Sequence, residues 1–390
     1  MGIWNAPVFG HIESTFKCKN IDRLGSENEF SSVRSWGNTS RKYDQQLRRA
    51  KVRAVSNDIK HPSTAAQSIA RNTMLFLWLA PVVALAVDEL IGDWSLQMDS
   101  ETPAWMSINQ TEGKWDAKMR LFVGSEGPHS NVARADGRLT FKLRQNKKTT
   151  DSKTVNVGMA DGVLDGVVCT TSQDGAVHND SFTGTKIPPV PTTPPDLSKV
   201  RFGLPIALLN GRDLTGWKPY EPDKKMGWSI QDGDLVNTTP KTDFSATGAY
   251  ANLRTNAVFE DFWLHVEFNI GEARNSGIYL RGMYEAQVVD RNSRMQGKQG
   301  VGAIFGRIEP TKNAGKEGGV WQTYDITLVD RHITVVLNGE KVIDNKSVSG
   351  PTAGAVFTNP TEPGPIYLQG DHTSVKYRNM YLAPVIKKEM

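Results

Sequence analysis

Apolar and polar residues alternate along many short segments in the C-terminal half of the chain. In the segment 262–268, Phe262, Leu264, Val266 and Phe268 are separated by more polar side chains. Successive side chains of a β-strand point to opposite faces of a sheet, so this period of two predicts a strand with one buried face. We find no convincing helical periodicity between residues 200 and 386, and we expect that region to consist of strands.

Further segments of the same kind are separated by turn-forming residues. They are 277–282, 285–289, 301–305, 324–329, 333–337, 342–343, 365–369 and 375–382. Asn338-Gly339 is a dipeptide typical of a tight hairpin turn. So many strands in one region predict two packed sheets, one of them curved.

The region 87–186 has its own series of strand-like segments. It opens with Gly92 and Trp94, a Gly-x-Trp pattern that resembles the start of lipocalin-type barrels. Regular short strands predict a small antiparallel β-barrel or sandwich. The proline-rich stretch 187–199 then predicts a stiff linker before the domain 200–386.

The N-terminal part of the chain reads as a targeting region rather than a folded domain. Met74–Ala86 is an apolar run of 13 residues, and Ala84 and Ala86 give it a small-x-small ending, which predicts a signal peptide. We expect residues 1–73 to be a disordered extension of the gene model, with translation starting at or near Met74. A short membrane anchor behind a basic tail is the alternative, with membrane contact only through the uncleaved segment.

The charge is unevenly distributed. Residues 1–73 carry a net charge of +6, which leaves −2 for residues 74–390. A mildly acidic folded region argues against nucleic acid as a partner. The predicted signal peptide makes us expect a periplasmic or extracellular protein.

The motifs of the region 202–385 resemble the 3-keto-disaccharide hydrolase family. Six motifs occur in the family's order: Leu208–Trp217, Trp228–Gly233, Asn275–Gly282, Tyr284–Asp290, Val336–Gly339, and Gly364–His372 with Lys376–Asn379. The resemblance implies a concanavalin-A-like jelly-roll sandwich and cleavage of 3-keto-glycosides or 3-keto-disaccharides. Two positions depart from the family pattern, because Gln322 replaces the usual Asn and Thr373 replaces a common Gly.

Strand alternation groups the polar residues of these motifs. Glu285 and Gln287 share one face of their strand, while Ala286 and Val288 take the other and suit a core. The same spacing pairs Tyr279 with Arg281, and Tyr367 with Gln369. Such a surface of amides, charged groups and aromatic rings suits a sugar. The predicted substrate-binding residues are Asn275, Tyr279, Gln287, Gln369 and Trp321.

A ketone at C3 of a sugar acidifies the hydrogen at C2, so that the C1 substituent can leave by elimination before water adds. This route requires a base, for which Glu285 or His372 is suitable. It also requires stabilisation of the enolate oxygen, by Arg281 or by a divalent metal ion. Asp290 and His372 are the candidate metal ligands, although no local ligand spacing supports them.

Other interpretations stay open at this point. Glu285 and Arg281 could form a buried structural ion pair. Asn275 could cap a turn, and Trp321 could be a core aromatic. At the level of function, the alternatives to a hydrolase are a non-catalytic carbohydrate-binding module and an interaction domain of a surface assembly.

Overall fold

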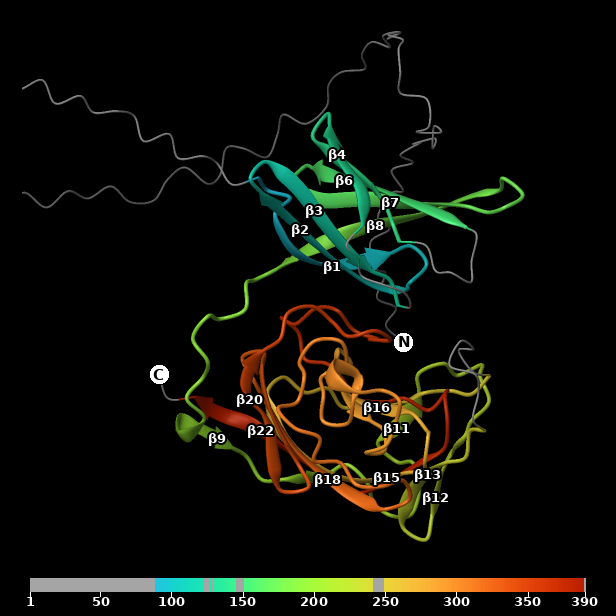
Figure 1. Ribbon diagram of the computed structural model, residues 1–390, viewed down its shortest axis with the longest axis vertical. Coiled ribbons are helices and arrows are strands. Elements are labelled where there is room, and N and C mark those ends of the chain that lie inside the picture. Colours follow the sequence, from blue (N-terminus) through green and yellow to red (C-terminus); the bar gives the residue numbers. More distant parts are fainter. Residues whose placement is uncertain (1–87, 123–126, 128, 145–150, 241–248, 389–390) are drawn as a thin grey trace, which may run out of the picture. The chain divides into compact units, whose positions relative to one another are not determined.

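The computed structural model describes residues 88–388, apart from 123–126, 128, 145–150 and 241–248 (Figure 1). Within these residues strands dominate, and the helices are two three-residue 3-10 turns, η2 (Leu197–Lys199) and η3 (Gly297–Gln299). The prediction of an all-β protein is confirmed. No helix in this part of the chain is long and apolar enough to cross a membrane. The predicted extension 1–73 and signal peptide 74–86 lie outside the described residues.

One antiparallel sheet of eight strands occupies residues 92–187. Its strands are β1 (Gly92–Met98), β2 (Pro103–Thr111), β3 (Lys114–Arg120), β4 (Ser130–Ala135), β5 (Arg138–Lys142), β6 (Ser152–Ala160), β7 (Val163–Thr171) and β8 (Val177–Ile187). The sheet order is β3-β2-β1-β8-β7-β6-β5-β4, so β1 pairs with β8 and the chain neighbours β3 and β4 form the edges. This is the strand order of an up-and-down barrel opened between β3 and β4.

Trp94 anchors the core of this first domain. Its side chain is buried, and its indole Nε1 donates a hydrogen bond of 3.0 Å to the carbonyl of Leu90. Buried residues of other strands, such as Met106 and Val157, belong to the same cluster. The indole N–H therefore has a partner where the ring is buried, as a stable core requires.

Two further sheets are formed by residues 200–388. The nine-stranded sheet has the order β12-β13-β22-β15-β18-β19-β20, with β9 and β10 also paired to β22. Its strands are β9 (Val200–Phe202), β10 (Ile206–Ala207), β12 (Trp228–Gln231), β13 (Asp234–Asn237), β15 (Phe262–Ile270), β18 (Trp321–Val329), β19 (His332–Leu337), β20 (Glu340–Ser347) and β22 (Val375–Lys388).

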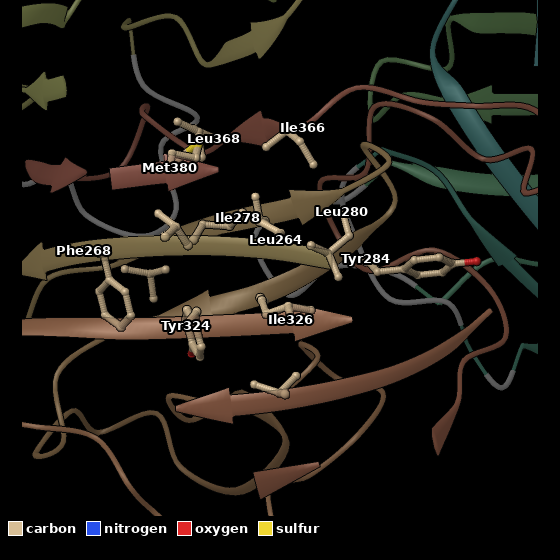
Figure 2. Close-up of a cluster of buried hydrophobic side chains, with 14 of the residues drawn as sticks. Leu264, Phe268, Ile278, Leu280, Tyr284, Tyr324, Ile326, Ile366, Leu368 and Met380 are labelled. Atoms are coloured by element: carbon tan, nitrogen blue, oxygen red, sulfur yellow. The ribbon is translucent and has the colours of Figure 1, made fainter. Parts of the chain in front are cut away.

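The five-stranded sheet has the order β11-β14-β21-β16-β17. Its strands are β11 (Trp217–Pro219), β14 (Leu253–Thr255), β16 (Ser276–Leu280), β17 (Tyr284–Val288) and β21 (Tyr367–Leu368). One continuous apolar cluster joins the two sheets, and Figure 2 shows part of it. Leu264 and Phe268 of β15 belong to it, together with Ile278 of β16 and Leu368 of β21. The two sheets thus form the expected jelly-roll sandwich.

Two local predictions have different outcomes. The Asn338-Gly339 turn joins β19 to β20, and both residues have positive φ values, 53° and 83°, as a two-residue hairpin turn requires. The predicted strand 301–305 is wrong, because this segment forms turns with single bridges from Ile304 to Ala286 and Ile308. Its apolar side chains Val301 and Ile304 are nevertheless buried, which explains why the apolar pattern resembled a strand.

Phe268 provides a test of the sandwich core. Its ring is fully buried and stacks on Tyr324 with a centroid separation of 4.9 Å. We expect Phe268→Ala to lower the free energy of unfolding by about 3–5 kcal/mol in denaturant titrations, because a large cavity remains. Tyr381→Ala on β22 is the control, since Tyr381 is 40% exposed, and it should cost less than about 1 kcal/mol. An equal loss of unfolding free energy in the two variants would contradict the placement of Phe268 in the core and of Tyr381 on the outer face.

Candidate functional site

The candidate site lies on the face of the five-stranded sheet that points away from the sandwich core. Across three adjacent strands, Tyr279 of β16 lies opposite Glu285 of β17 on one side and Tyr367 of β21 on the other. The chain neighbours Ile278 and Ala286 pack in the core. The alternation predicted for these strands is therefore the one observed.

Loops cover this face of β16 and β17. The hydroxyl of Tyr279 donates a hydrogen bond of 2.8 Å to the carbonyl of Ala353, and the backbone N–H of Glu285 donates one of 3.0 Å to Oγ1 of Thr352. Tyr279 is only 1% exposed and Glu285 only 3%. The row of polar residues thus lies beneath the loop that contains Thr352 and Ala353.

Glu285 is a buried carboxyl group without a cationic partner among the described residues. Burial raises its pKa to about 8, a hydrogen bond with Tyr279 opposes this rise, and the negative charge of Asp371 adds to it. Desolvation disfavours the charged form of a carboxyl group, and a nearby anion acts in the same direction. Glu285 is therefore protonated at neutral pH, and the alternative of an ion pair with Arg281 is not observed.

Gly277 makes room for this carboxyl group. A Cβ atom at position 277 would lie 2.2 Å from Oε1 of Glu285, which is shorter than any real contact. A glycine inside a strand often marks such a close approach. The absence of a side chain at Gly277 is therefore a condition for the position of Glu285.

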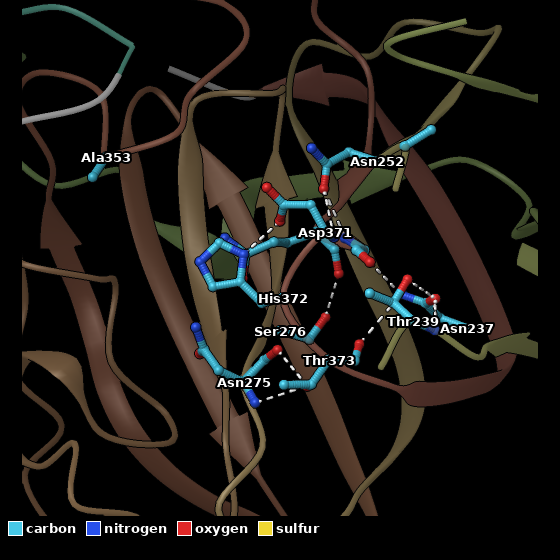
Figure 3. A network of polar contacts seen from close by, with 12 residues as sticks. Asn237, Thr239, Asn252, Asn275, Ser276, Ala353, Asp371, His372 and Thr373 are labelled. Atoms are coloured by element: carbon cyan, nitrogen blue, oxygen red, sulfur yellow. Dashed lines mark hydrogen bonds and ion pairs between the residues drawn. The ribbon is translucent and has the colours of Figure 1, made fainter. Parts of the chain in front are cut away.

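His372 is held by the residue that precedes it. Its Nδ1 lies 2.5 Å from Oδ1 of Asp371, and the two side chains face each other in Figure 3. Asp371 is 6% exposed, whereas the side chain of His372 is 19% exposed. A carboxylate at Nδ1 favours the tautomer with the proton on that nitrogen, in which Nε2 carries the lone pair.

Buried amides fix the turn that carries Asp371 and His372. Oδ1 of Asn252 accepts hydrogen bonds from the backbone N–H groups of Gly370, at 2.7 Å, and Asp371, at 3.2 Å. Asn237 donates from Nδ2 to the carbonyl of Gly370 at 2.8 Å. The position of the imidazole is thus set by side chains far away in sequence.

Asn275 and Gln369 each present a buried oxygen without a partner. Neither Oδ1 of Asn275 nor Oε1 of Gln369 has a hydrogen bond among the described residues. The backbone of Asn275 is fixed by Thr373, whose hydroxyl accepts from the N–H at 3.0 Å and donates to the carbonyl at 2.8 Å. Gln369 is fixed to Gly277, because its N–H donates to the carbonyl of Gly277 at 3.0 Å. Both orphaned oxygens are thus presented by ordered backbone beside the candidate site.

Arg281 and Gln287 are engaged away from Glu285. Arg281 has a φ of 55° in the turn between β16 and β17, and its Nη2 donates to the carbonyls of Pro360, at 2.8 Å, and Glu362. Gln287 is fully buried, and its Nε2 donates to the carbonyl of Gln299 at 3.1 Å. The hydrogen bonds of these side chains connect loops to the sheet, and none of them reaches Glu285.

Trp321 lies on the other sheet. On β18 its neighbours Gln322 and Tyr324 point inward, so Trp321 is on the outer face of the nine-stranded sheet. There the guanidinium of Arg378 lies 3.9 Å from the centre of its ring. The structure therefore does not bring Trp321 together with Glu285 and His372.

The predicted metal ligands do not form a site in the described part of the chain. No group of three or more His, Cys, Asp or Glu side chains there could hold a metal ion. The carboxylate of Asp290 accepts hydrogen bonds of 2.9 Å from the backbone N–H groups of Ala273 and Asn292. We therefore derive no step that passes through a metal ion.

Three residues of the site were not identified from the sequence. Asp371 precedes His372 directly, and this adjacency of a carboxylate and an imidazole was an available signal. Gly277 lies inside a predicted strand, which was a second signal. Asn252 follows a short segment without a clear pattern, and only the tertiary structure reveals its contact with the turn at Asp371.

Comparisons with known proteins found a matching family model and several similar solved structures. Residues 205–383 match the family model of the 3-keto-alpha-glucoside-1,2-lyase-like domain. No match was found among curated proteins. Solved structures with a similar fold include two of candidate glycosyl hydrolases from Parabacteroides distasonis ATCC 8503. The first is 20% identical with a TM-score of 0.38, covering 46% of this chain and 93% of that one. The second is 22% identical with a TM-score of 0.35, covering 46% of this chain and 98% of that one.

A non-specific endo-beta-1,3(4)-glucanase of family GH16 is also similar, at 12% identity and a TM-score of 0.29, covering 51% of this chain and 94% of that one. The family match rests on residues 205–383, which include the whole five-stranded sheet and the Asp371–His372 turn. Residues 205–383 therefore form a 3-keto-alpha-glucoside-1,2-lyase-like domain.

Proposed function

We propose that this domain cleaves 3-keto-α-glucosides by elimination followed by hydration. The observation that carries the proposal is the buried carboxyl of Glu285, whose pKa is raised to about 8 and which lies within electrostatic reach of Asp371. Asp371 connects the two groups, because its carboxylate binds His372 and its charge raises the pKa of Glu285. A carboxyl group with a raised pKa suits the role of an acid, and an imidazole held by a carboxylate suits that of a base.

The two groups supply the proton transfers that elimination needs. His372, as the base, removes the proton from C2, which the C3 ketone acidifies. Electrons of the C2–H bond form the C1–C2 double bond, and the bond from C1 to the leaving oxygen breaks. Glu285, as the acid, donates its proton to that oxygen, so the leaving group departs as an alcohol. Water then adds its hydroxyl to C1 and a proton to C2, which gives the free 3-keto sugar.

Asn275 and Gln369 are the candidate ligands of the sugar hydroxyls. Their side-chain oxygens are buried and unpaired among the described residues, and such atoms cost free energy unless a donor reaches them. Hydroxyl groups of a bound sugar are donors of the required kind. This pair of oxygens supports a polyol substrate beside His372 and Glu285.

We also propose that the mature protein is exported. The apolar run Met74–Ala86 and its small-x-small ending support this. Sequencing of the amino terminus of the protein recovered outside the cytoplasm should then give Val87 as the first residue. Recovery of peptides from residues 1–73 in the native protein would contradict it.

Loss of either proton-transfer group should abolish cleavage. We expect Glu285→Gln and His372→Ala to lower kcat by about 10²- to 10⁴-fold on a 3-keto-α-glucoside disaccharide. In D₂O the wild-type product should carry deuterium at C2, and the matching unoxidised glucoside should remain uncleaved. Lys376→Gln, an exposed change on the nine-stranded sheet, is the control. Turnover without deuterium at C2 would rule out elimination, and sugar binding without any product would favour a binding module.

The pH dependence of stability tests the protonation of Glu285. Folding favours the protonated form, because burial raises the pKa from 4.5 to about 8. The protonated group's contribution to stability is present below pH 4.5 and is lost as the pH rises through about 8. Relative to Glu285→Gln, we expect the wild type to lose about 1.4 kcal/mol of unfolding free energy per pH unit in this interval. Activity should fall above the same pH. If the unfolding free energies of the wild type and Glu285→Gln change in parallel with pH, the raised pKa of Glu285 is contradicted.

A further inference from the structure

Two cations extend the polar row of the candidate site toward the opposite edge of the five-stranded sheet. Arg254 of β14 lies opposite Tyr367, and Lys218 of β11 lies opposite Arg254. In register, the row therefore runs through Lys218, Arg254, Tyr367, Tyr279 and Glu285. Adjacent strands are about 4.8 Å apart, so the backbone at Arg254 lies about 14 Å from that at Glu285.

Neither cation has a carboxylate partner in the described part of the chain. Arg254 is half-buried, and its one hydrogen bond there runs from Nε to the carbonyl of Thr255 at 3.3 Å. Lys218 is exposed. The nearest acidic neighbour in sequence, Glu221, already accepts from Asn252. Arg254 and Lys218 thus provide positive charge that no carboxylate of the described residues neutralises through an ion pair.

Aromatic surface lies between these cations and the reacting groups. Tyr220 packs edge-to-face on Tyr367 with a centroid separation of 5.7 Å. Burial raises the pKa of Tyr220, Glu221 adds to the rise, and the charge of Arg254 opposes it, which places Arg254 within electrostatic reach of this ring. A ring-shaped group over Tyr220 would therefore approach Arg254.

Arg254 also lies near Asn252, the residue that fixes the His372 turn. Asn252 precedes Arg254 by two residues, and its Oδ1 accepts from the backbone N–H of Asp371. Residues two apart in extended chain lie about 7 Å from each other on one face. Arg254 therefore lies next to Tyr367 across the sheet and two residues after Asn252, which contacts Asp371.

We propose that the domain acts on 3-keto-glucosides whose leaving group carries an anionic substituent, which Arg254 and Lys218 bind. This inference rests on the proposed function, with the sugar ring at Glu285 and His372 and the leaving group over Tyr220. A guanidinium recognises carboxylate, sulfate and phosphate oxygens alike, so the shared chemistry is an oxyanion. The two cations act as specificity-determining residues and take no part in proton transfer.

Matched substrates test the preference. We compare the 3-keto-α-glucosides of 4-hydroxybenzoate and 4-hydroxybenzamide, which differ in charge but hardly in shape. We expect kcat/KM to favour the acidic substrate by about five- to tenfold at low salt, and less at high salt. Arg254→Gln and Lys218→Gln should bring the ratio of the two kcat/KM values closer to one, and Lys376→Gln should leave that ratio unchanged.

A binding measurement without turnover separates this inference from the proposed function. Calorimetry of the whole protein with 4-hydroxybenzoate, 4-hydroxyphenyl sulfate and 4-hydroxyphenyl phosphate identifies the preferred oxyanion, with 4-hydroxybenzamide as the neutral control. Binding that weakens about five- to tenfold in Arg254→Gln supports the subsite, even if neither glucoside is cleaved. Equal cleavage of both glucosides, unaffected by Arg254→Gln and Lys218→Gln, overturns the subsite and leaves the proposed function standing. If the protein neither cleaves the glucosides nor binds an oxyanion, both the subsite and the proposed function are overturned.

Discussion

The desolvation of one carboxyl group determines the chemistry available to the C-terminal domain. Glu285 is 3% exposed and has no cation beside it in the described residues, and the charge of Asp371 further disfavours its ionisation. A solvated carboxylate at this position would be a weak base and no acid at neutral pH. Because burial raises the pKa of Glu285, the proposed mechanism assigns the role of base to His372, whose Nδ1 contacts Asp371. The proposed role of Glu285 thus follows from its surroundings rather than from its residue type.

The sandwich makes this burial compatible with a stable fold. Alternate residues of β16 and β17 enter the apolar core, and their neighbours form the polar row on the other face. Gly277 leaves space for the carboxyl group, and the loop at Thr352 and Ala353 covers it through hydrogen bonds. The same strands therefore stabilise the domain on one side and keep Tyr279 and Glu285 buried on the other. The side chain of His372 is more exposed than that of Glu285, at 19%.

Alternation along strands predicted the sandwich and the shared face of Tyr279 and Glu285, because both depend on local backbone geometry. The pattern could not assign strands to sheets, so it did not show that Trp321 lies on the nine-stranded sheet. It also could not predict the contacts of Arg281 with the loop at Pro360, since loops have no periodicity. The supports of the Asp371 turn, such as Asn252, come from residues more than a hundred positions away. The roles assigned to Glu285 and His372 remain predictions.

The protonation state of Glu285 is the claim on which the proposed mechanism depends. Infrared difference spectroscopy of the wild type against Glu285→Gln measures it directly, through the carbonyl stretch of a protonated carboxylic acid. The account predicts that the Glu285 band persists through neutral pH and disappears near pH 8, where burial places its pKa. Disappearance of the band near the ordinary pKa of a glutamate, about 4.3, would show that the group is charged at neutral pH and would contradict the account.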